Sequence, residues 1–133
     1  GCEATANTAG GGVQLSLSGG TSLSSTSAKL LGWGGIPGQP GVFFYGPDAI
    51  SLPLGDGLRC VGGAPVRRLR PPITFDLFGT TEYLLDYQAE PLGAGPATVM
   101  PGSTWHFQLW YRDPNSQGAG HNLSSSLRLT FCP

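Results

Sequence analysis

The sequence predicts an all-β protein: a single antiparallel β-sandwich, jelly-roll or Ig-like, with about nine short strands and essentially no helix. Glycine and proline supply 22 and 12 of the 133 residues, and both interrupt helices. Apolar residues alternate with polar ones in several short runs, and no run shows the helical period. Gly-Gly, Pro-Gly and Asp-Gly pairs separate these runs and favour turns.

The chain divides into an extended N-terminal arm, residues 1–12, and a sandwich domain, residues 13–133. The arm contains no large apolar side chain and ends in three consecutive glycines, a composition typical of a flexible joint. Residues 13–18 then alternate between apolar and polar, as a half-buried strand does. Further strands are expected at residues 28–33, 41–45, 58–61, 66–69, 73–78, 83–87, 98–100, 104–111 and 123–131.

Two of these strands have a clear register, because every second side chain in them is apolar. The opposite face of the strand at residues 104–112 is more polar but includes a tryptophan. The expected core-facing residues are Trp105, Phe107, Leu109 and Tyr111 in that strand and Leu123, Leu127, Leu129 and Phe131 in the last one, and the opposite face carries His106, Gln108, Trp110 and Arg112.

Charge is scarce and balanced, with seven basic and eight acidic residues and a formal net charge of −1. This balance excludes the basic surface that nucleic acids and anionic membranes require. No apolar run reaches the roughly 20 residues that cross a bilayer as a helix, so no membrane insertion is expected. Low net charge also makes long-range repulsion between identical subunits weak.

No catalytic or cofactor-binding constellation is recognisable, so we expect no enzyme and no cofactor. The two histidines, His106 and His121, have no nucleophile motif near them, and the Gly-x-Ser-x-Gly pattern is missing. Loop aspartates are ligands that calcium prefers, but no Asp-x-Asp-x-Asp loop is present, and no metal site is expected. The loop aspartates considered are Asp48, Asp56, Asp86 and Asp113.

A single lysine, scarce charge and abundant serine, threonine and glycine indicate an extracellular or cell-surface protein. The three cysteines, Cys2, Cys60 and Cys132, then predict a disulfide, with three buried reduced thiols as the alternative. They form no Cys-x-x-Cys pair, so neither a zinc site nor a redox-active cysteine pair is indicated. A bridge between two of them would close a long loop and stabilise the fold by roughly 3–5 kcal/mol. The odd cysteine predicts a free thiol or a bond between molecules, and the pairing stays open.

Exposed aromatic side chains would provide a carbohydrate-binding surface, because an aromatic face packs against the apolar face of a sugar ring. Trp110 is the first candidate, since it lies opposite the core residues of its strand, and Trp33 and Tyr45 are the others. An outward tryptophan can equally be covered by a loop. Asn122 begins an Asn-Leu-Ser triplet that matches the N-glycosylation pattern. The arginines in the most highly charged segments would either contact an anionic glycan or form a solvated strand face. They are Arg67, Arg68, Arg70 and Arg112.

Several sequence blocks occur together in an order that resembles a known family. An early Cys with Asn-Thr-Ala-Gly is followed by Gly-Val-Phe-Phe-Tyr-Gly and by Gly-Asp-Gly-Leu-Arg-Cys-Val-Gly-Gly. The most specific block is Trp-His-Phe-Gln-Leu-Trp-Tyr-Arg-Asp-Pro at residues 105–114. Over nearly its whole length the chain resembles secreted bacterial surface β-domains, often found near the C-termini of large surface proteins of aquatic bacteria. The resemblance implies a surface location and no chemistry.

We expect the chain to be a structural subunit of an extracellular filament or surface assembly. An extended arm such as residues 1–12 adds a strand to a neighbouring sheet, and head-to-tail repetition builds a filament. Cys2 would bond to a cysteine of the next subunit; an arm and a disulfide kept within one chain are the alternative. The arm residues are Cys2, Ala4, Ala6 and Thr8, and the receiving strands carry Phe107, Leu109, Leu127, Leu129 and Phe131.

The expected partners are therefore other copies of the chain, in a homo-oligomer or filament. The alternative function is a secreted carbohydrate-binding module whose partners are glycans and whose contacts are Trp110, Trp33 and Tyr45. A calcium-dependent adhesion domain is a more remote alternative.

Overall fold

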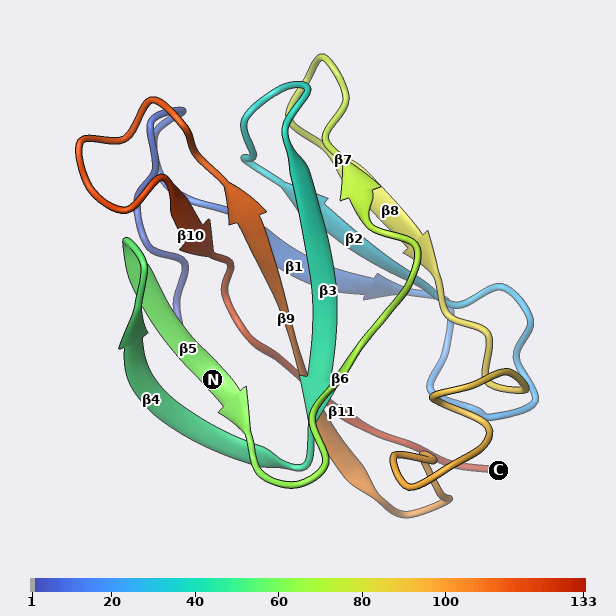
Figure 1. Cartoon of the computed structure of the whole chain (residues 1–133). Coiled ribbons are helices and arrows are strands. Elements are labelled where there is room, and N and C mark those ends of the chain that lie inside the picture. The colour runs from blue at the N-terminus through green and yellow to red at the C-terminus, as the bar shows by residue number, and fades with distance from the viewer. Residues whose placement is uncertain (1) are drawn as a thin grey trace.

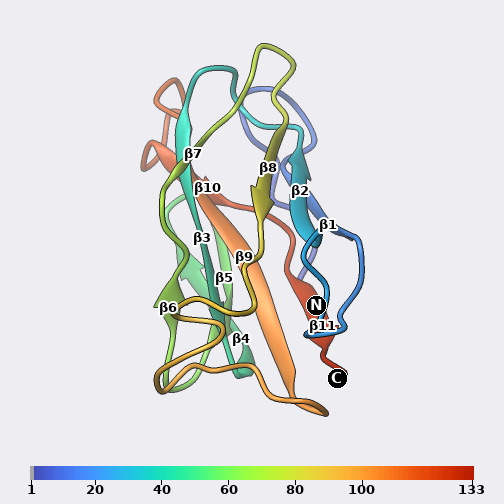
Figure 2. The same cartoon turned by 90° about the vertical axis from the view of Figure 1, so that its right-hand side faces the viewer.

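The computed structural model describes residues 2–133, which form eleven β-strands and no helix. Its two main sheets pack face to face, and Figure 2 shows them nearly edge-on. One sheet has the order β1-β2-β8; the other follows the order β10-β9-β3-β6, with β11 pairing with β9 and β7 with β3. The strands are β1 Gln14–Ser18, β2 Lys29–Trp33, β3 Pro40–Gly46, β4 Asp48–Leu54, β5 Gly57–Gly62, β6 Arg67–Arg68, β7 Ile73–Thr74, β8 Thr81–Leu84, β9 Thr104–Arg112, β10 His121–Leu123 and β11 Leu127–Thr130.

All strand pairings in the two sheets are antiparallel, so the predicted antiparallel all-β sandwich is the observed fold. The strand count is eleven rather than about nine, because β4 was not expected and the run at residues 123–131 forms two strands instead of one, while residues 98–100 form none. With no helix in residues 2–133, the described part of the chain has no helix that could cross a membrane.

The core lies between the two sheets and is rich in aromatic rings. The predicted inward face of β9 is confirmed, since its four alternating apolar side chains are all buried. Tyr45 of β3 stacks on Phe107 with the ring centroids 5.2 Å apart, and Phe131 packs edge-on against Phe107 at 6.3 Å. Such aromatic pairs are stabilising beyond the apolar area they bury.

A long loop, residues 85–103, closes one end of this core (Figure 1). The sequence predicted strands at residues 83–87 and 98–100, but β8 ends at Leu84 and residues 98–100 are irregular. The apolar side chains that suggested strands, including Tyr87 and Val99, are buried, but they belong to a loop in which most backbone hydrogen bonds are local. The N–H of Val99, for example, donates to the carbonyl of Leu92 at 2.9 Å.

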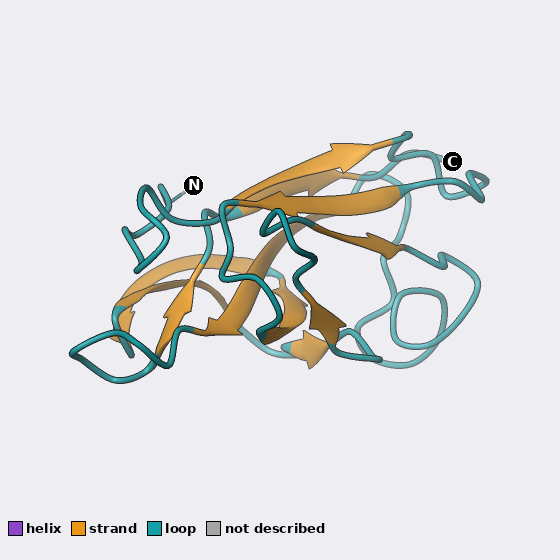
Figure 3. Ribbon diagram, turned by 90° about the horizontal axis from the view of Figure 1, so that it is seen from above, coloured by secondary structure: helices purple, strands orange, loops and turns teal. Residues whose placement is uncertain are grey.

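The β4–β5 hairpin forms a partial third layer on the outer face of the larger sheet (Figures 1 and 3). Beneath it Gln108, on the face of β9 opposite the core, is fully buried. Its Nε2 donates to the carbonyls of Leu58 and Ser124 at 2.9 and 2.8 Å, and its Oε1 accepts from the N–H of Cys60 at 2.9 Å. One buried amide thus joins β9, the hairpin and the chain after β10.

The single strand predicted at residues 123–131 is instead two strands, β10 and β11. Two buried serines separate them: Ser124 Oγ accepts from the N–H of Leu109 at 2.8 Å, and Ser125 Oγ accepts from that of Leu15 at 3.0 Å. Because the interruption changes which way the side chains point, Leu123 packs with Phe44 in a small outer cluster and not in the main core.

Candidate functional site

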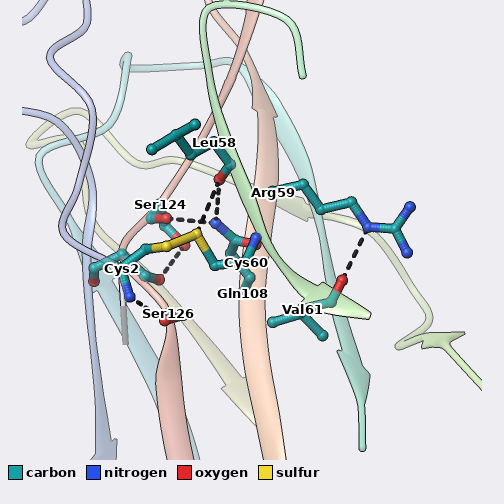
Figure 4. The surroundings of a disulfide bond; sticks show 9 residues. Cys2, Leu58, Arg59, Cys60, Val61, Gln108, Ser124 and Ser126 are labelled. Carbon is teal, nitrogen blue, oxygen red and sulfur yellow. Dashed lines mark hydrogen bonds between the residues drawn. A yellow bond between two sulfur atoms is a disulfide. The ribbon is translucent and has the colours of Figure 1, made fainter. Parts of the chain in front are cut away.

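The N-terminal arm is bound to its own domain. Cys2 forms a disulfide with Cys60 of β5, with the two Cα atoms 6.1 Å apart (Figure 4). The N–H of Cys2 also donates to Ser126 Oγ at 2.7 Å, and the N–H of Ser126 donates to the carbonyl of Cys2 at 3.0 Å. Of the two alternatives drawn from the sequence, an intersubunit bond or a bridge within one chain, the structure has the bridge within one chain.

The remaining arm residues also contact their own sandwich and form no strand. Asn7 Nδ2 donates to the carbonyl of Gly34 at 2.9 Å and to the hydroxyl of Tyr111 at 3.0 Å. The N–H of Thr8 donates to Asp113 at 2.9 Å. An arm exchanged between copies would first have to give up these bonds and the disulfide. Ala4 and Ala6 lie between these anchor points, and the proposed receiving residues Phe107, Leu109, Leu129 and Phe131 are buried within their own core, with Leu127 packed against it.

Cys132 is the free cysteine of residues 2–133 and is exposed. Its backbone is fixed, since its N–H donates to the carbonyl of Thr21 at 3.0 Å and its carbonyl accepts from the N–H of Leu23 at 2.8 Å. The thiol therefore lies at the protein surface on an ordered segment.

Asn122 is fully buried, so the predicted glycosylation at this residue is wrong. Its Nδ2 donates to the arm carbonyls of Ala6 and Thr5, at 3.0 and 3.4 Å. The amide nitrogen that would carry a glycan instead fastens the arm to β10, and a bulky sugar has no room there.

The loop aspartates have structural hydrogen bonds. Asp113 is buried and accepts from Thr8, and Asp56 at the tip of the β4–β5 hairpin accepts from the N–H of Ala119 at 2.7 Å. Asp86 accepts from the N–H of Gln88 at 2.9 Å, while Asp48 begins β4. Among residues 2–133 no group of three or more His, Cys, Asp or Glu side chains is arranged to hold a metal ion.

The three aromatic residues named as glycan contacts have different environments. Tyr45 is completely buried, and its hydroxyl donates to the carbonyl of Ala97 at 2.6 Å, so its assignment as a glycan contact is wrong. Trp33 is 45% exposed at the end of β2. Trp110 is partly exposed and lines a groove on the opposite side of the sandwich.

This Trp110 groove has a volume of about 350 Å³ and lies between the larger sheet and the β4–β5 hairpin. Val42 and Phe44 of β3 and Trp110 of β9 are neighbours on the outer face of that sheet, because Val42 pairs directly with Trp110. The hairpin contributes Leu54 and Arg59, and Val66 and Arg68 complete the lining.

Trp110 is held in place by polar contacts at its edge and on its face. Its Nε1 donates to Nδ1 of His121 at 3.0 Å, and the two rings are 5.2 Å apart. The guanidinium carbon of Arg112 lies 5.2 Å from the centre of the indole, within cation–π distance. The indole is therefore preorganised before any ligand arrives.

Among residues 2–133 the two arginines of the groove have no carboxylate within ion-pair distance. Arg59 donates from Nε to the carbonyl of Val61 at 2.9 Å, and Figure 4 shows its guanidinium directed away from the disulfide. Arg68 is exposed. Within residues 2–133 the one ion pair joins Lys29 to Glu82, on the other sheet. The groove thus combines an apolar floor with unneutralised positive charge.

A second surface lies at one end of the sandwich, in the turn at residues 76–80 between β7 and β8, here called the apex loop (Figure 1). The carbonyl of Asp76 accepts from the N–H of Gly79 at 3.0 Å, and its N–H donates to the carbonyl of Thr80 at 2.9 Å. Its Oδ1 accepts from the N–H groups of Phe78 and Thr80 at 2.9 and 3.0 Å. Gly79 has φ +73°, a left-handed conformation that favours glycine.

Two apolar side chains project from this braced turn, since Leu77 and Phe78 are each 88% exposed. The Thr80 hydroxyl, with the N–H groups of Thr80 and Phe78, holds the pKa of Asp76 below its usual range, so the loop carries a negative charge at neutral pH. The sequence predicted a strand at residues 73–78, but β7 ends at Thr74. The Asp-Leu-Phe-Gly run was the signal for a turn, because Asp caps turns and Gly closes them.

The structure thus separates the candidate residues named from the sequence. Of the three aromatic candidates Trp110 alone lines the groove, where Arg68 joins it, and Trp33 lies on the other sheet. The arm is fastened by Cys2 to the hairpin that walls the groove. Comparisons with protein families, with curated proteins and with solved structures find no match to this chain.

Proposed function

We propose that the protein is a subunit of an extracellular surface assembly whose copies associate through exposed apolar side chains and keep their own N-terminal arms. The observation that carries this proposal is the adjacent pair Leu77 and Phe78, each 88% exposed on an ordered turn. Exposed apolar side chains gain free energy when a second surface covers them. A preformed turn also loses little conformational entropy on binding.

The position of the arm supports association by a route other than arm exchange. Cys2 is bonded to Cys60 of the same chain, and Asn7 and Thr8 donate hydrogen bonds to residues of the same domain. Exchange would require breaking a covalent bond, whereas contact through the apex loop leaves the fold unchanged.

The cysteine chemistry and the low charge support an extracellular, assembled state. Disulfides persist in oxidising compartments, and the Cys2–Cys60 bond links distant parts of the chain. The net charge of −1 leaves little repulsion between copies packed side by side.

The expected affinity of an isolated contact is low. Covering a Leu and a Phe side chain contributes about 3–6 kcal/mol, and the apolar surface that they cover on the receiving copy adds to this gain. The lowest estimates of the cost of association are about 4 kcal/mol. Pairs of molecules should therefore form only at high concentration, and an array would be stabilised by its many repeated contacts.

Sedimentation velocity of the oxidised protein over a concentration series tests this function. We expect the average sedimentation coefficient of the wild type to rise with concentration. That of Leu77→Ser/Phe78→Ser should stay at the value of the monomer. Met100→Ser is the matched control, since Met100 is a 58% exposed apolar side chain outside the apex loop. A wild type that sediments as a monomer up to millimolar concentration would contradict the proposal.

Carbohydrate binding is a second candidate, favoured by the surroundings of Trp33. This half-exposed indole borders a depression of about 310 Å³ on the three-stranded sheet. Asp76, Thr80 and Glu82 also line it, and their oxygens are of the kind that bind sugar hydroxyls beside a stacking ring. Titration with neutral oligosaccharides, monitored by tryptophan fluorescence, should show saturation that Trp33→Ala abolishes; an unchanged signal in that variant excludes this site.

A further inference from the structure

We propose that the apex loop of one copy inserts Leu77 and Phe78 into the Trp110 groove of the next copy. The inference rests on the proposed function and names the surface that receives the loop. The contact is heterologous, because the loop of one copy binds a different surface, the groove, on the next copy.

The groove matches the loop in polarity. Five of its lining residues are apolar or aromatic, and Arg59 and Arg68 are the two polar ones. A sugar needs several hydrogen-bond partners for its hydroxyls, which such a lining does not supply. Leu and Phe side chains need none, and the floor of Val42, Phe44 and Trp110 offers the Phe78 ring an aromatic neighbour.

The groove also matches the loop in charge. Asp76 precedes Leu77 directly, and hydrogen bonds from its own turn keep its carboxylate ionised. Arg59 and Arg68 border the groove without a carboxylate within ion-pair distance in the described chain. Insertion of the loop brings the acidic residue toward these arginines, which sets the orientation of the contact and disfavours the pairing of two loops or two grooves.

The location of the two surfaces makes the contact open-ended. In Figure 1 the apex loop lies at the top of the molecule, whereas the β4–β5 hairpin that walls the groove lies at the lower left. A copy that has inserted its loop keeps an empty groove, and a copy whose groove is filled keeps a free loop. Heterologous contacts of this kind continue head to tail until a rotation closes them.

The size of the contact makes it reversible. A stable protein interface covers about 800 Å² on each partner, and two side chains cover much less. We therefore expect rapid exchange, and truncating the two loop side chains should weaken association by about tenfold or more.

A mixing experiment with two disabled variants of the oxidised full chain tests the contact. Leu77→Ser/Phe78→Ser removes the loop side chains, and Arg59→Glu/Arg68→Glu reverses the groove charge at two accessible positions. Circular dichroism and thermal melts verify that both variants fold, and Met100→Ser again serves as the control. Each variant alone should remain monomeric at concentrations where the wild type associates.

A 1:1 mixture of the two variants should form heterodimers and nothing larger, because it contains one intact loop and one intact groove per pair. If the groove variant associates as the wild type does, or if the mixture forms no heterodimer, this contact is refuted while self-association itself stands. A hexuronate oligosaccharide that occupies the groove without inhibiting association also refutes it. If the wild type never associates, the proposed function fails as well.

Discussion

Removal of the Cys2–Cys60 disulfide should cost the fold about 4 kcal/mol. The bond joins residues 58 positions apart, and the loop-closure entropy that it removes from the unfolded chain corresponds to about 4 kcal/mol at 25 °C. A domain of this size has a total stability of about 5–15 kcal/mol. The double variant Cys2→Ala/Cys60→Ala should therefore fold but lose a large fraction of its stability.

Guanidinium denaturation monitored by tryptophan fluorescence measures this loss. Cys132→Ser is the matched control, since Cys132 is exposed and unbridged, and it should leave the midpoint unchanged. A loss below about 1 kcal/mol in the double variant, or an equal loss in Cys132→Ser, would refute the assigned pairing and the entropy argument with it.

The same variant separates two routes to assembly. With the disulfide absent, the arm is held only by hydrogen bonds such as those of Asn7 and Asn122. If copies associate through the apex loop, the double variant should associate as the wild type does. Markedly stronger association of the double variant would show that released arms exchange between copies.

Three further outcomes follow from single side chains. Gln108→Ala leaves the buried N–H of Cys60, the buried carbonyl of Ser124 and the part-buried carbonyl of Leu58 without this partner, so urea denaturation should show a loss of about 3 kcal/mol. A loss below about 1 kcal/mol would contradict the bridging role. Tyr45→Phe removes the bond to Ala97 and should cost about 1–2 kcal/mol by the same measurement, and an unchanged midpoint would contradict it. Because the folded pKa of Asp76 is depressed, its stabilisation of the apex loop is complete above the unfolded pKa of about 3.9. That stabilisation is lost as the pH falls through the folded pKa, so self-association should decline in this acidic range. An NMR titration of the Asp76 carboxyl carbon measures the folded pKa, and a value at or above about 3.9 would contradict the assignment.

Most of the sandwich could be predicted from alternation alone. The β9 pattern is unambiguous because one face of the strand packs in the main core, and Trp105 and Tyr111 mark its ends. The β4 strand gave no such signal, since most of its side chains are exposed and it contains Pro53. Its hairpin in turn buries Gln108, a side chain that the sequence placed on the outer face of its strand.

The candidate site was less accessible to sequence reasoning. The outward direction of Trp110 followed from its register, but the groove walls come from β5 and β6, far away in the chain. The pairing of Cys2 depends on how the arm crosses the sheet, and three cysteines permit three pairings. Leu77 and Phe78 resembled the end of a strand because Ile73 and Phe75, just before them, alternate as core residues do.

The most direct test of head-to-tail contact is photo-cross-linking from position 78. A photoreactive phenylalanine analogue in place of Phe78 should cross-link copies at high concentration, and mass spectrometry should locate the adducts in peptides that contain Val42, Phe44, Arg68 or Trp110. The same analogue at Met100 should give no such adducts. Adducts from position 78 that map elsewhere, or that join two position-78 peptides, would contradict the contact between the apex loop and the Trp110 groove.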